Sequence, residues 1–261
     1  MATRGPKAGG GSGGSGPRSA LGRTKALIGD RADTVVRSGY LDALGAGDVR
    51  RSVSQVAMQS RLLPRVYEQL WRPALFGAAT LGLREKEEAA LMRELLDLER
   101  GDTVLDVACG PGNTLRRLVD RIGPDGLAVG VDAAPAMLQR AVRDTPSSNV
   151  AYVRADGSDL PFLDGAFDAV ACFGALYLVD RPFDVLDELV RVVAPEGKMA
   201  ILTSCTRGPG LARPIVNVAA IGSGFRWFGP DEITGALEDH GLVEIRQEVR
   251  GVMQYVGARR P

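Results

Sequence analysis

The sequence predicts an α/β fold, built as a doubly wound, mostly parallel sheet with helices on both faces. Three observations lead to this prediction. From residue 101 onwards, short buried strands alternate with amphipathic helices. A glycine-rich turn, residues 109–112, joins the first of these strands to a helix. Acidic residues end the next two strands, at the edge where open parallel sheets bind ligands.

The composition sets the broad class of the chain. Of the 261 residues, 45% are apolar and 25% are charged, so we expect one domain with appended helices rather than two domains. The formal net charge of zero leaves no basic footprint for nucleic acid. No apolar run is long enough to span a bilayer. Three dispersed cysteines fit small buried side chains in a reducing compartment, so we predict a cytoplasmic location and no metal site.

The first 100 residues divide into two segments. Residues 1–20 are rich in Gly and Ser and contain no acidic residue, so they are predicted to be a disordered tail, either native or an added linker. Residues 21–100 are predicted to be helical. Within them, 61–76 concentrates large apolar and aromatic side chains, and 84–98 has the broad apolar face of a helix packed on the core.

The strand over 103–107 and the turn after it form the centre of the predicted fold. Gly110 and Gly112 lack Cβ, so the backbone can adopt unusual conformations and approach a ligand closely. The following helix places Leu115, Leu118 and Ile122 on one face. A dinucleotide-binding loop would need a third small residue where Leu115 stands, and a Walker loop would need a Lys, so phosphate binding is disfavoured.

Carboxylates follow the next two strands. The second strand ends at Asp132, twenty positions after Gly112, where a carboxylate can accept hydrogen bonds from a ribose diol. This spacing serves NAD and S-adenosylmethionine equally well. The third strand ends at Asp156, which can accept from an exocyclic amine, while Gly157 lets the backbone pass the edge of a base. The fourth strand begins near Asp168, to which we assign a structural role.

The rest of the chain continues the alternation and then closes the sheet. The predicted elements are helices over 135–142 and 180–193, strands over 167–173 and 198–205, and a closing antiparallel pair over 242–249 and 251–258. Asp180 is predicted to start the second of these helices. A last helix is predicted to end at His240, where a cation complements the helix dipole, so the only histidine is given a structural role.

Two motifs in this region resemble those of a known family. The spacing D-x-A-x-G-x-G, formed by Asp106, Ala108, Gly110 and Gly112, resembles the first motif of the class I S-adenosylmethionine-dependent methyltransferases, which usually have Gly where Ala108 stands. The run A-D-G-x-x-L-P-F followed by F-D, within 155–168, resembles the same family. The similarity covers roughly 104–205 and is closest to the quinone-biosynthesis and natural-product methyltransferases of type 11. It implies a Rossmann-like, seven-stranded sheet.

The resemblance implies S-adenosylmethionine as the cofactor. In the family, the acid at the position of Asp156 meets the adenine amino group. From their place at the start of the helix over 135–142, Ala133, Ala134 and Met137 are expected to border the base, with packing in the core as the alternative for Met137. Phe173 and Tyr177 would offer aromatic faces to the cationic sulfonium, an attraction of roughly 0.5–2 kcal/mol. The complete set of expected cofactor residues is Asp106, Ala108, Gly110, Gly112, Asp132, Ala133, Met137, Asp156, Gly157, Phe173 and Tyr177.

The resemblance also suggests where the acceptor binds. In this family the segment before the core often forms a lid, which would place Tyr67, Trp71 and Arg72 near the acceptor; an aromatic stripe packed on the core is the equal alternative. Residues 206–228 interrupt the alternation, so we expect an insertion that shapes the acceptor pocket with Trp227. The predicted domains are a tail over 1–20, a helical segment with the lid over 21–100, and a methyltransferase domain over 101–261 that contains the insertion.

These features predict S-adenosylmethionine-dependent methyl transfer to a small, partly apolar acceptor. The expected reaction is O- or C-methylation of a quinone-, polyketide- or phenol-like metabolite by in-line displacement, with the protein mainly aligning the reactants. No residue is identified as a general base. Two alternatives stay open: an NAD-dependent oxidoreductase on a similar sheet, and a protein that binds S-adenosylmethionine without turnover.

Overall fold

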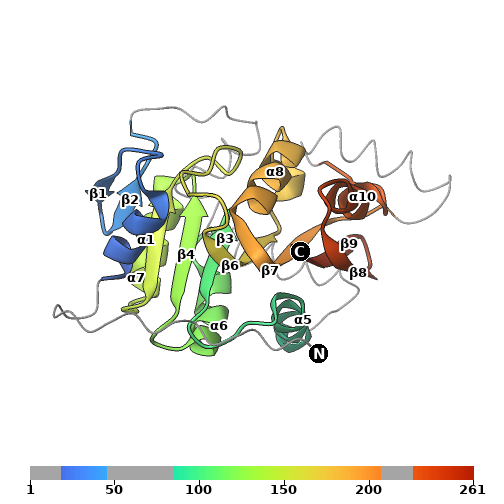
Figure 1. The fold of residues 1–261 in the computed structure, drawn as a ribbon, viewed down its shortest axis with the longest axis horizontal. Coiled ribbons are helices and arrows are strands. Elements are labelled where there is room, and N and C mark those ends of the chain that lie inside the picture. Colours follow the sequence, from blue (N-terminus) through green and yellow to red (C-terminus); the bar gives the residue numbers. More distant parts are fainter. Residues whose placement is uncertain (1–18, 46–84, 207–225) are drawn as a thin grey trace.

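The computed structural model describes residues 19–45, 85–206 and 226–261, which form a sheet with helices on both faces (Figure 1). The strands are β1 (Val35–Arg37), β2 (Tyr40–Asp42), β3 (Thr103–Val107), β4 (Leu127–Asp132), β5 (Val150–Arg154), β6 (Phe167–Phe173), β7 (Val193–Ser204), β8 (Val243–Arg250) and β9 (Met253–Arg259). The helices are α1 (Ala20–Ile28), α5 (Glu85–Leu96), α6 (Asn113–Ile122), α7 (Pro135–Asp144), the short 3₁₀ helix η2 (Leu176–Leu178), α8 (Pro182–Val192) and α10 (Glu232–Asp239).

The strand order is β1-β2-β5-β4-β3-β6-β7-β9-β8. Strands β2, β5, β4, β3, β6 and β7 pair in parallel, while β1 and the β8–β9 hairpin pair antiparallel to their neighbours. From β3 the chain first builds outwards through β4 and β5, and then returns to the other side of β3 to form β6 and β7. This reversal is a topological switch point, and ligands of open α/β sheets bind at the carboxyl ends of the strands beside it.

The sheet has two more strands than the seven predicted. A hairpin, β1–β2, lies within the segment that was predicted to be helical, and β2 pairs with β5 through Leu41 and Val153. Its turn is formed by Ser38 and Gly39, with φ of 47° and 85°. Two positive φ angles in a two-residue loop match the twist of paired strands, so a Ser-Gly pair between short apolar strands is the physical reason for the hairpin.

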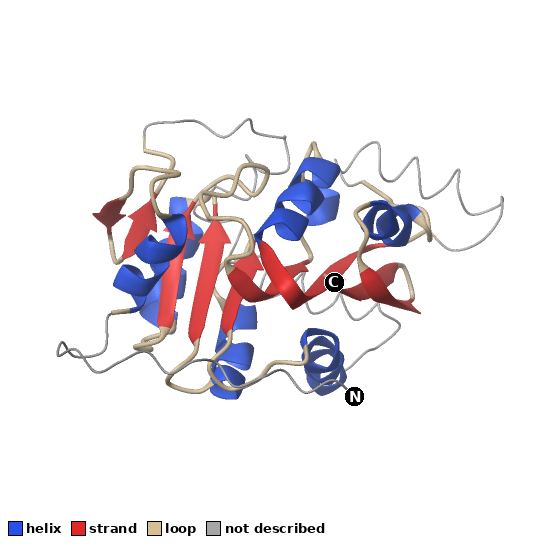
Figure 2. Cartoon of the chain, in the orientation of Figure 1, coloured by secondary structure: helices blue, strands red, loops and turns tan. Residues whose placement is uncertain are grey.

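Helices cover both faces of the sheet (Figure 2), and an apolar layer holds them on each face. Along β3 the side chains alternate: Leu105 and Val107 pack with residues of α1, α8 and α10, whereas Val104 packs with residues of α5, α6 and α7. As predicted, Leu115 and Leu118 on α6 are buried against the sheet. No helix in the described ranges is long and apolar enough to cross a membrane.

Several expectations for individual residues are confirmed. The three cysteines are buried and form no disulfide. Asp168 has a structural contact, because its Oδ2 accepts a hydrogen bond of 2.9 Å from the Thr103 N–H and thereby joins the start of β3 to β6. His240 is the C-terminal cap of α10, followed by Gly241 with φ 76°. Its Nε2 lies 2.8 Å from Asp187 Oδ1 on α8.

A glycine in β4 sets how closely α6 packs, and this can be tested. A Cβ added at Gly130 would lie 2.8 Å from Cys109 Sγ, Leu115 Cδ1 and Tyr152 Cδ1. We expect Gly130→Ala to lower the free energy of unfolding by about 1–3 kcal/mol in urea denaturation, as overpacking does. Gly235→Ala in α10 is the control, since nothing lies within 4 Å of its added Cβ, and it is expected to gain up to about 1 kcal/mol. Equal stability of the two variants would contradict this packing.

Candidate functional site

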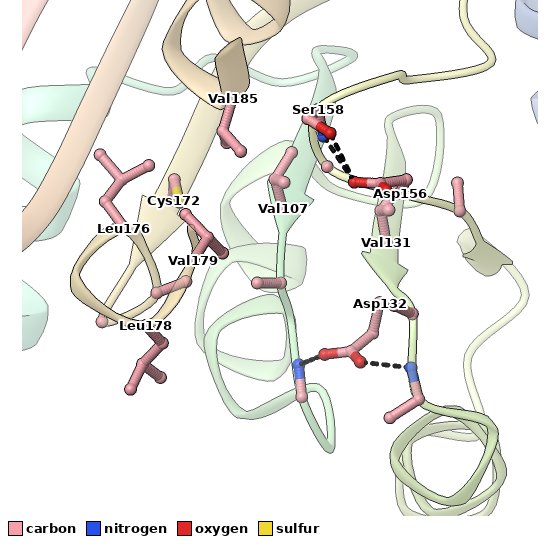
Figure 3. Close-up of a pocket in the computed structure, with 18 of the residues that line it drawn as sticks. Val107, Val131, Asp132, Asp156, Ser158, Cys172, Leu176, Leu178, Val179 and Val185 are labelled. Carbon is pink, nitrogen blue, oxygen red and sulfur yellow. Dashed lines mark hydrogen bonds between the residues drawn. The ribbon is translucent and has the colours of Figure 1, made fainter. Parts of the chain in front are cut away.

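A cavity of about 390 Å³ lies at the carboxyl ends of β3, β4, β5 and β6 (Figure 3). Its lining is mostly apolar, and its carboxylates belong to Asp132, Asp156 and Asp180. The cavity therefore occupies the switch point of the sheet, where the sequence predicted a ligand.

The turn after β3 forms the floor of this cavity. Ala108, Gly110 and Gly112 all have positive φ, at 59°, 53° and 80°. The turn is held by two backbone hydrogen bonds, from the Cys109 N–H to the Val131 carbonyl and from the Gly112 N–H to the Cys109 carbonyl. Ala108 and Gly110 line the cavity, and nothing lies within 4 Å of a Cβ added at Gly110. Gly110 thus leaves space that a ligand can use.

Gly112 has a different role from Gly110. It is not a lining residue; a Cβ at Gly112 would collide with the Tyr152 hydroxyl, which comes from β5 beneath the turn. Gly112 therefore allows the turn to close onto the sheet. The two glycines of the motif separate into one that faces the cavity and one that faces the core.

Asp132 fixes the turn to the end of β4. Its Oδ2 accepts a hydrogen bond of 2.9 Å from the Gly110 N–H, and its Oδ1 accepts one of 2.8 Å from the Ala134 N–H (Figure 3). Burial raises the pKa of Asp132, and hydrogen bonds from Ala134, Gly110 and Ala133 partly offset this rise. A carboxylate has about four acceptor positions, so Asp132 keeps acceptor capacity for a ligand hydroxyl beside these backbone bonds.

Asp156 and Gly157 line the cavity beyond the end of β5. Asp156 Oδ1 accepts hydrogen bonds from the Ser158 N–H, at 2.9 Å, and from the Ser158 hydroxyl, at 2.8 Å. Both bonds use one oxygen, which leaves Oδ2 for a ligand donor. A Cβ at Gly157 would lie 3.3 Å from Val107 Cγ1, so this glycine keeps the loop close to β3.

The wall of the cavity opposite Asp132 is apolar. Figure 3 shows Leu176, Leu178 and Val179 gathered on the side away from Asp132, with Cys172 behind them. Burial, and then the negative charge of Asp106, raise the pKa of Cys172 far above its ordinary value, so this thiol stays neutral. This wall was not predicted from the sequence. The signal was available in the apolar run between the fourth strand and the following helix.

The structure changes the interpretation of Asp180. Helix α8 begins at Pro182 with Arg181 at its N-cap position and no side-chain cap bond, so the prediction that Asp180 starts the helix is wrong. Asp180 and Arg181 line the mouth of the cavity instead, and Arg181 forms an ion pair of 2.8 Å with Asp184. Pro182 supplies the first helical turn, because its fixed φ suits that position.

Of the expected cofactor residues, seven line the cavity: Ala108, Gly110, Asp132, Ala133, Met137, Asp156 and Gly157. Asp106, Gly112, Phe173 and Tyr177 do not. Asp106 is 1% exposed and lies beneath the turn. Phe173 and Tyr177 pack against the cluster of Leu202, Met253 and Tyr255.

The expected acceptor residues are only partly covered by the structure. Tyr67, Trp71 and Arg72, and most of the expected insertion, lie outside the described residues. Trp227 is half-buried and does not line the cavity. Its neighbours run beside the end of β7: the Ser204 hydroxyl donates to the Arg226 carbonyl, and the Thr206 N–H donates to the Phe228 carbonyl.

Fold and site together define an α/β protein with a ligand cavity at the switch point, built from a glycine turn and two carboxylates. Comparison with known proteins shows what this segment is similar to. Residues 104–197 match the family described as Methyltransferase domain.

Known proteins similar to the chain agree with this match. The 2-phytyl-1,4-naphtoquinone methyltransferase of a Nostoc species is 42% identical over 107 residues, which are 39% of this chain and 46% of that protein. The chain therefore spans about half the length of the curated relatives it matches. A SAM-dependent methyltransferase structure from Aquifex aeolicus matches with TM-score 0.56 and 22% identity, over 76% of this chain and 98% of that one. The [4+2]-cyclase SpnF matches with TM-score 0.62 and 18% identity, over 82% and 98%. These structures show that the fold is shared.

The different roles of the two glycines predict different costs of substitution. Ala at Gly110 only strains a positive φ, so Gly110→Ala is expected to lose about 1–2 kcal/mol in chemical denaturation. Gly112→Ala adds the collision with Tyr152 and is expected to lose at least about 1 kcal/mol more. Tyr152→Phe removes the colliding oxygen, so it should recover part of the Gly112→Ala loss in a double-mutant cycle. Additive effects would contradict the contact.

Proposed function

We propose that this chain transfers the methyl group of S-adenosylmethionine to a small, partly apolar acceptor, by O- or C-methylation of a quinone-, polyketide- or phenol-like metabolite. One observation carries the proposal. Asp132 stands in the cavity wall inside the methyltransferase domain, with both oxygens oriented by backbone N–H groups. That arrangement suits a ribose diol, which donates two hydrogen bonds to neighbouring oxygens.

The cavity fits the cofactor in size and in chemistry. Its volume of about 390 Å³ suits a ligand of nucleoside size. Asp132 would hold the ribose, Ala133 and Met137 would border the adenine, and Asp156 Oδ2 would accept from its amino group. Gly110 leaves room for the amino-acid portion. When bound, S-adenosylmethionine supplies an electrophilic methyl group on a sulfonium.

The role of the protein in this chemistry is mainly to align and to exclude water. The apolar wall formed by Leu176, Leu178 and Val179 keeps solvent from one side of the cavity. Cys172 stays protonated, and His240 lies on α10 rather than in the lining, so neither is assigned a catalytic role. Alignment of nucleophile and methyl group is itself a large part of catalysis for such a displacement.

The acceptor is proposed from the site and from the relatives together. The Nostoc relative is named for a 2-phytyl-1,4-naphthoquinone, which is an apolar ring system. We keep Tyr67, Trp71, Arg72 and Trp227 as the proposed acceptor residues. The proposed organisation remains a tail over 1–20, a helical lid segment over 21–100, and a catalytic domain over 101–261 with its insertion at 206–228. A small-molecule partner, no nucleic-acid partner and a cytoplasmic location complete the proposal.

The NAD-dependent alternative is not favoured. Leu115 occupies the position that must be small in a dinucleotide loop, and in the structure it is fully buried on α6 against the sheet. A pyrophosphate would need the close approach that this side chain prevents. Turnover is tested separately from binding: transfer of labelled methyl from S-adenosylmethionine to reduced naphthoquinones or phenols supports the enzyme, and binding with no transfer to such acceptors would contradict it.

Calorimetry on Asp132→Ala tests the cofactor site. Wild type is expected to bind S-adenosylmethionine and S-adenosylhomocysteine but not NAD. Loss of two charge-assisted hydrogen bonds is expected to weaken binding roughly 100-fold in the variant. Asp120→Ala, at an exposed position on α6, serves as the control and is expected to bind like wild type. Unchanged affinity in Asp132→Ala would contradict the assignment of Asp132 to the cofactor site.

The pH dependence of binding provides a second test. The ionised form of Asp132 accepts the ribose hydrogen bonds, so affinity is expected to be full above its pKa and to fall as the pH drops through it. Because burial raises this pKa, the fall is expected at higher pH than for an ordinary aspartate. Calorimetric titration of S-adenosylhomocysteine across acidic pH measures it. Asp132→Asn cannot titrate, so the same step in that variant would refute the assignment.

A further inference from the structure

The loop between β5 and β6 has two ends with different surroundings. Its first residues, Asp156, Gly157 and Ser158, line the cavity. Its later residues, 160–164, lie against α8 and α1. The two ends are joined by a β-bridge between Asp156 and Asp159, where the Asp159 N–H donates to the Asp156 carbonyl at 3.2 Å. A constraint on residue 160 therefore reaches Asp156 through a short, bonded stretch of backbone.

Arg191 on α8 supplies that constraint. A guanidinium has five N–H donors in a rigid fork, and all five have acceptors within reach here. Nη1 donates to the Phe162 carbonyl at 2.8 Å and to Asp164 Oδ1 at 2.7 Å. Nη2 donates to the Leu160 carbonyl at 2.9 Å. Nε and Nη2 both donate to Glu188, each at 2.7 Å.

Glu188, on the same helix as Arg191, binds the loop as well. Its Oε2 accepts a hydrogen bond of 2.6 Å from the Leu160 N–H, so both backbone polar groups of Leu160 are bound to α8 side chains. Burial opposes ionisation of Glu188, but the hydrogen bonds from Arg191 and Leu160 outweigh it and lower its pKa. The side chains of Glu188 and Arg191 are 16% and 19% exposed, so water competes weakly for these bonds.

Helix α1 and the turn after it hold the same stretch of the loop from a second side. The Leu163 N–H donates to the Leu27 carbonyl at 2.9 Å, and Arg31 forms an ion pair of 3.2 Å with Asp164. Each of these contacts holds one residue of the loop. Arg191, by contrast, binds three of its residues, Leu160, Phe162 and Asp164. No other residue of the described ranges is bonded by its side chain to all three.

We propose that Arg191 is a positioning residue for recognition of the adenine base, which it serves by holding the 160–164 stretch so that Asp156 keeps its place in the cavity wall. This rests on the proposed function, in which Asp156 accepts from the adenine amino group. Arg191 touches no ligand itself. Its effect is therefore on which base is accepted, rather than on the chemistry of methyl transfer.

The test compares two ligands that differ only at the base. S-adenosylhomocysteine carries the amino group, whereas S-inosylhomocysteine carries a carbonyl oxygen that would face the Asp156 carboxylate. Wild type is expected to prefer the first by roughly 10- to 100-fold in calorimetry, the factor contributed by a hydrogen bond to a charged group. Arg191→Lys keeps the charge but loses the fork, so the preference is expected to fall to within a few fold.

Arg260→Lys is the matched control. Arg260 Nη1 donates to the carbonyls of Val190, Arg191 and Val193, where α8 meets the start of β7, at the end of the sheet away from the cavity. Its replacement is expected to lower stability while keeping the wild-type preference for adenine. Glu188→Gln removes the charge that pairs with Arg191 and is a second variant should Arg191→Lys not fold; its preference is also expected to fall.

The outcomes separate the two proposals. If wild type binds both ligands equally, the role of Asp156 in the proposed function is wrong. If wild type discriminates and Arg191→Lys discriminates as strongly, or if Arg260→Lys loses the preference to the same extent, the positioning role of Arg191 is overturned. Loss of preference in Arg191→Lys and Glu188→Gln, with Arg260→Lys unchanged, supports it.

Discussion

The contact on which the site depends is the carboxylate of Asp132 between two backbone N–H groups. It joins the turn after β3, through Gly110, to the turn after β4, through Ala134. Without it the two strand ends would be linked near the cavity mainly by the backbone bond from Cys109 to Val131. The carboxylate is costly to bury, which the raised pKa of Asp132 records, and that cost is offset by the bonds it receives. A ligand with two adjacent hydroxyls would complete this arrangement.

The cavity has polar groups on one side of the switch point and apolar groups on the other. The ends of β4 and β5 supply the oriented carboxylates Asp132 and Asp156, whereas the end of β6 and η2 supply apolar side chains and a neutral thiol. In the proposed function, the polar groups would fix the orientation of the nucleoside, and the apolar wall would exclude water from the side where methyl transfer takes place. Support for each side comes from outside the cavity, from Tyr152 beneath the turn and from Arg191 behind the β5–β6 loop.

The central part of this architecture could be predicted from the sequence because its signals are local. The strand, glycine turn and helix around Gly110 lie within about a dozen residues, and Asp132 follows at a fixed spacing. The β1–β2 hairpin was missed because three-residue strands carry almost no periodicity, and only Ser38-Gly39 marks the turn. Phe173 and Tyr177 were assigned to the cofactor because the end of β6 was known but the direction of each side chain was not. The bonds of Arg191 to Leu160 and Phe162 span about thirty residues, so no local pattern reveals them.

A crystal structure with S-adenosylhomocysteine would test the account most directly. If Asp132 binds the ribose, the ribose hydroxyls are expected within hydrogen-bonding distance of the two Asp132 oxygens. The adenine amino group is expected beside Asp156 Oδ2. Density for the ligand away from the ends of β4 and β5, or a ribose turned from Asp132, would contradict it.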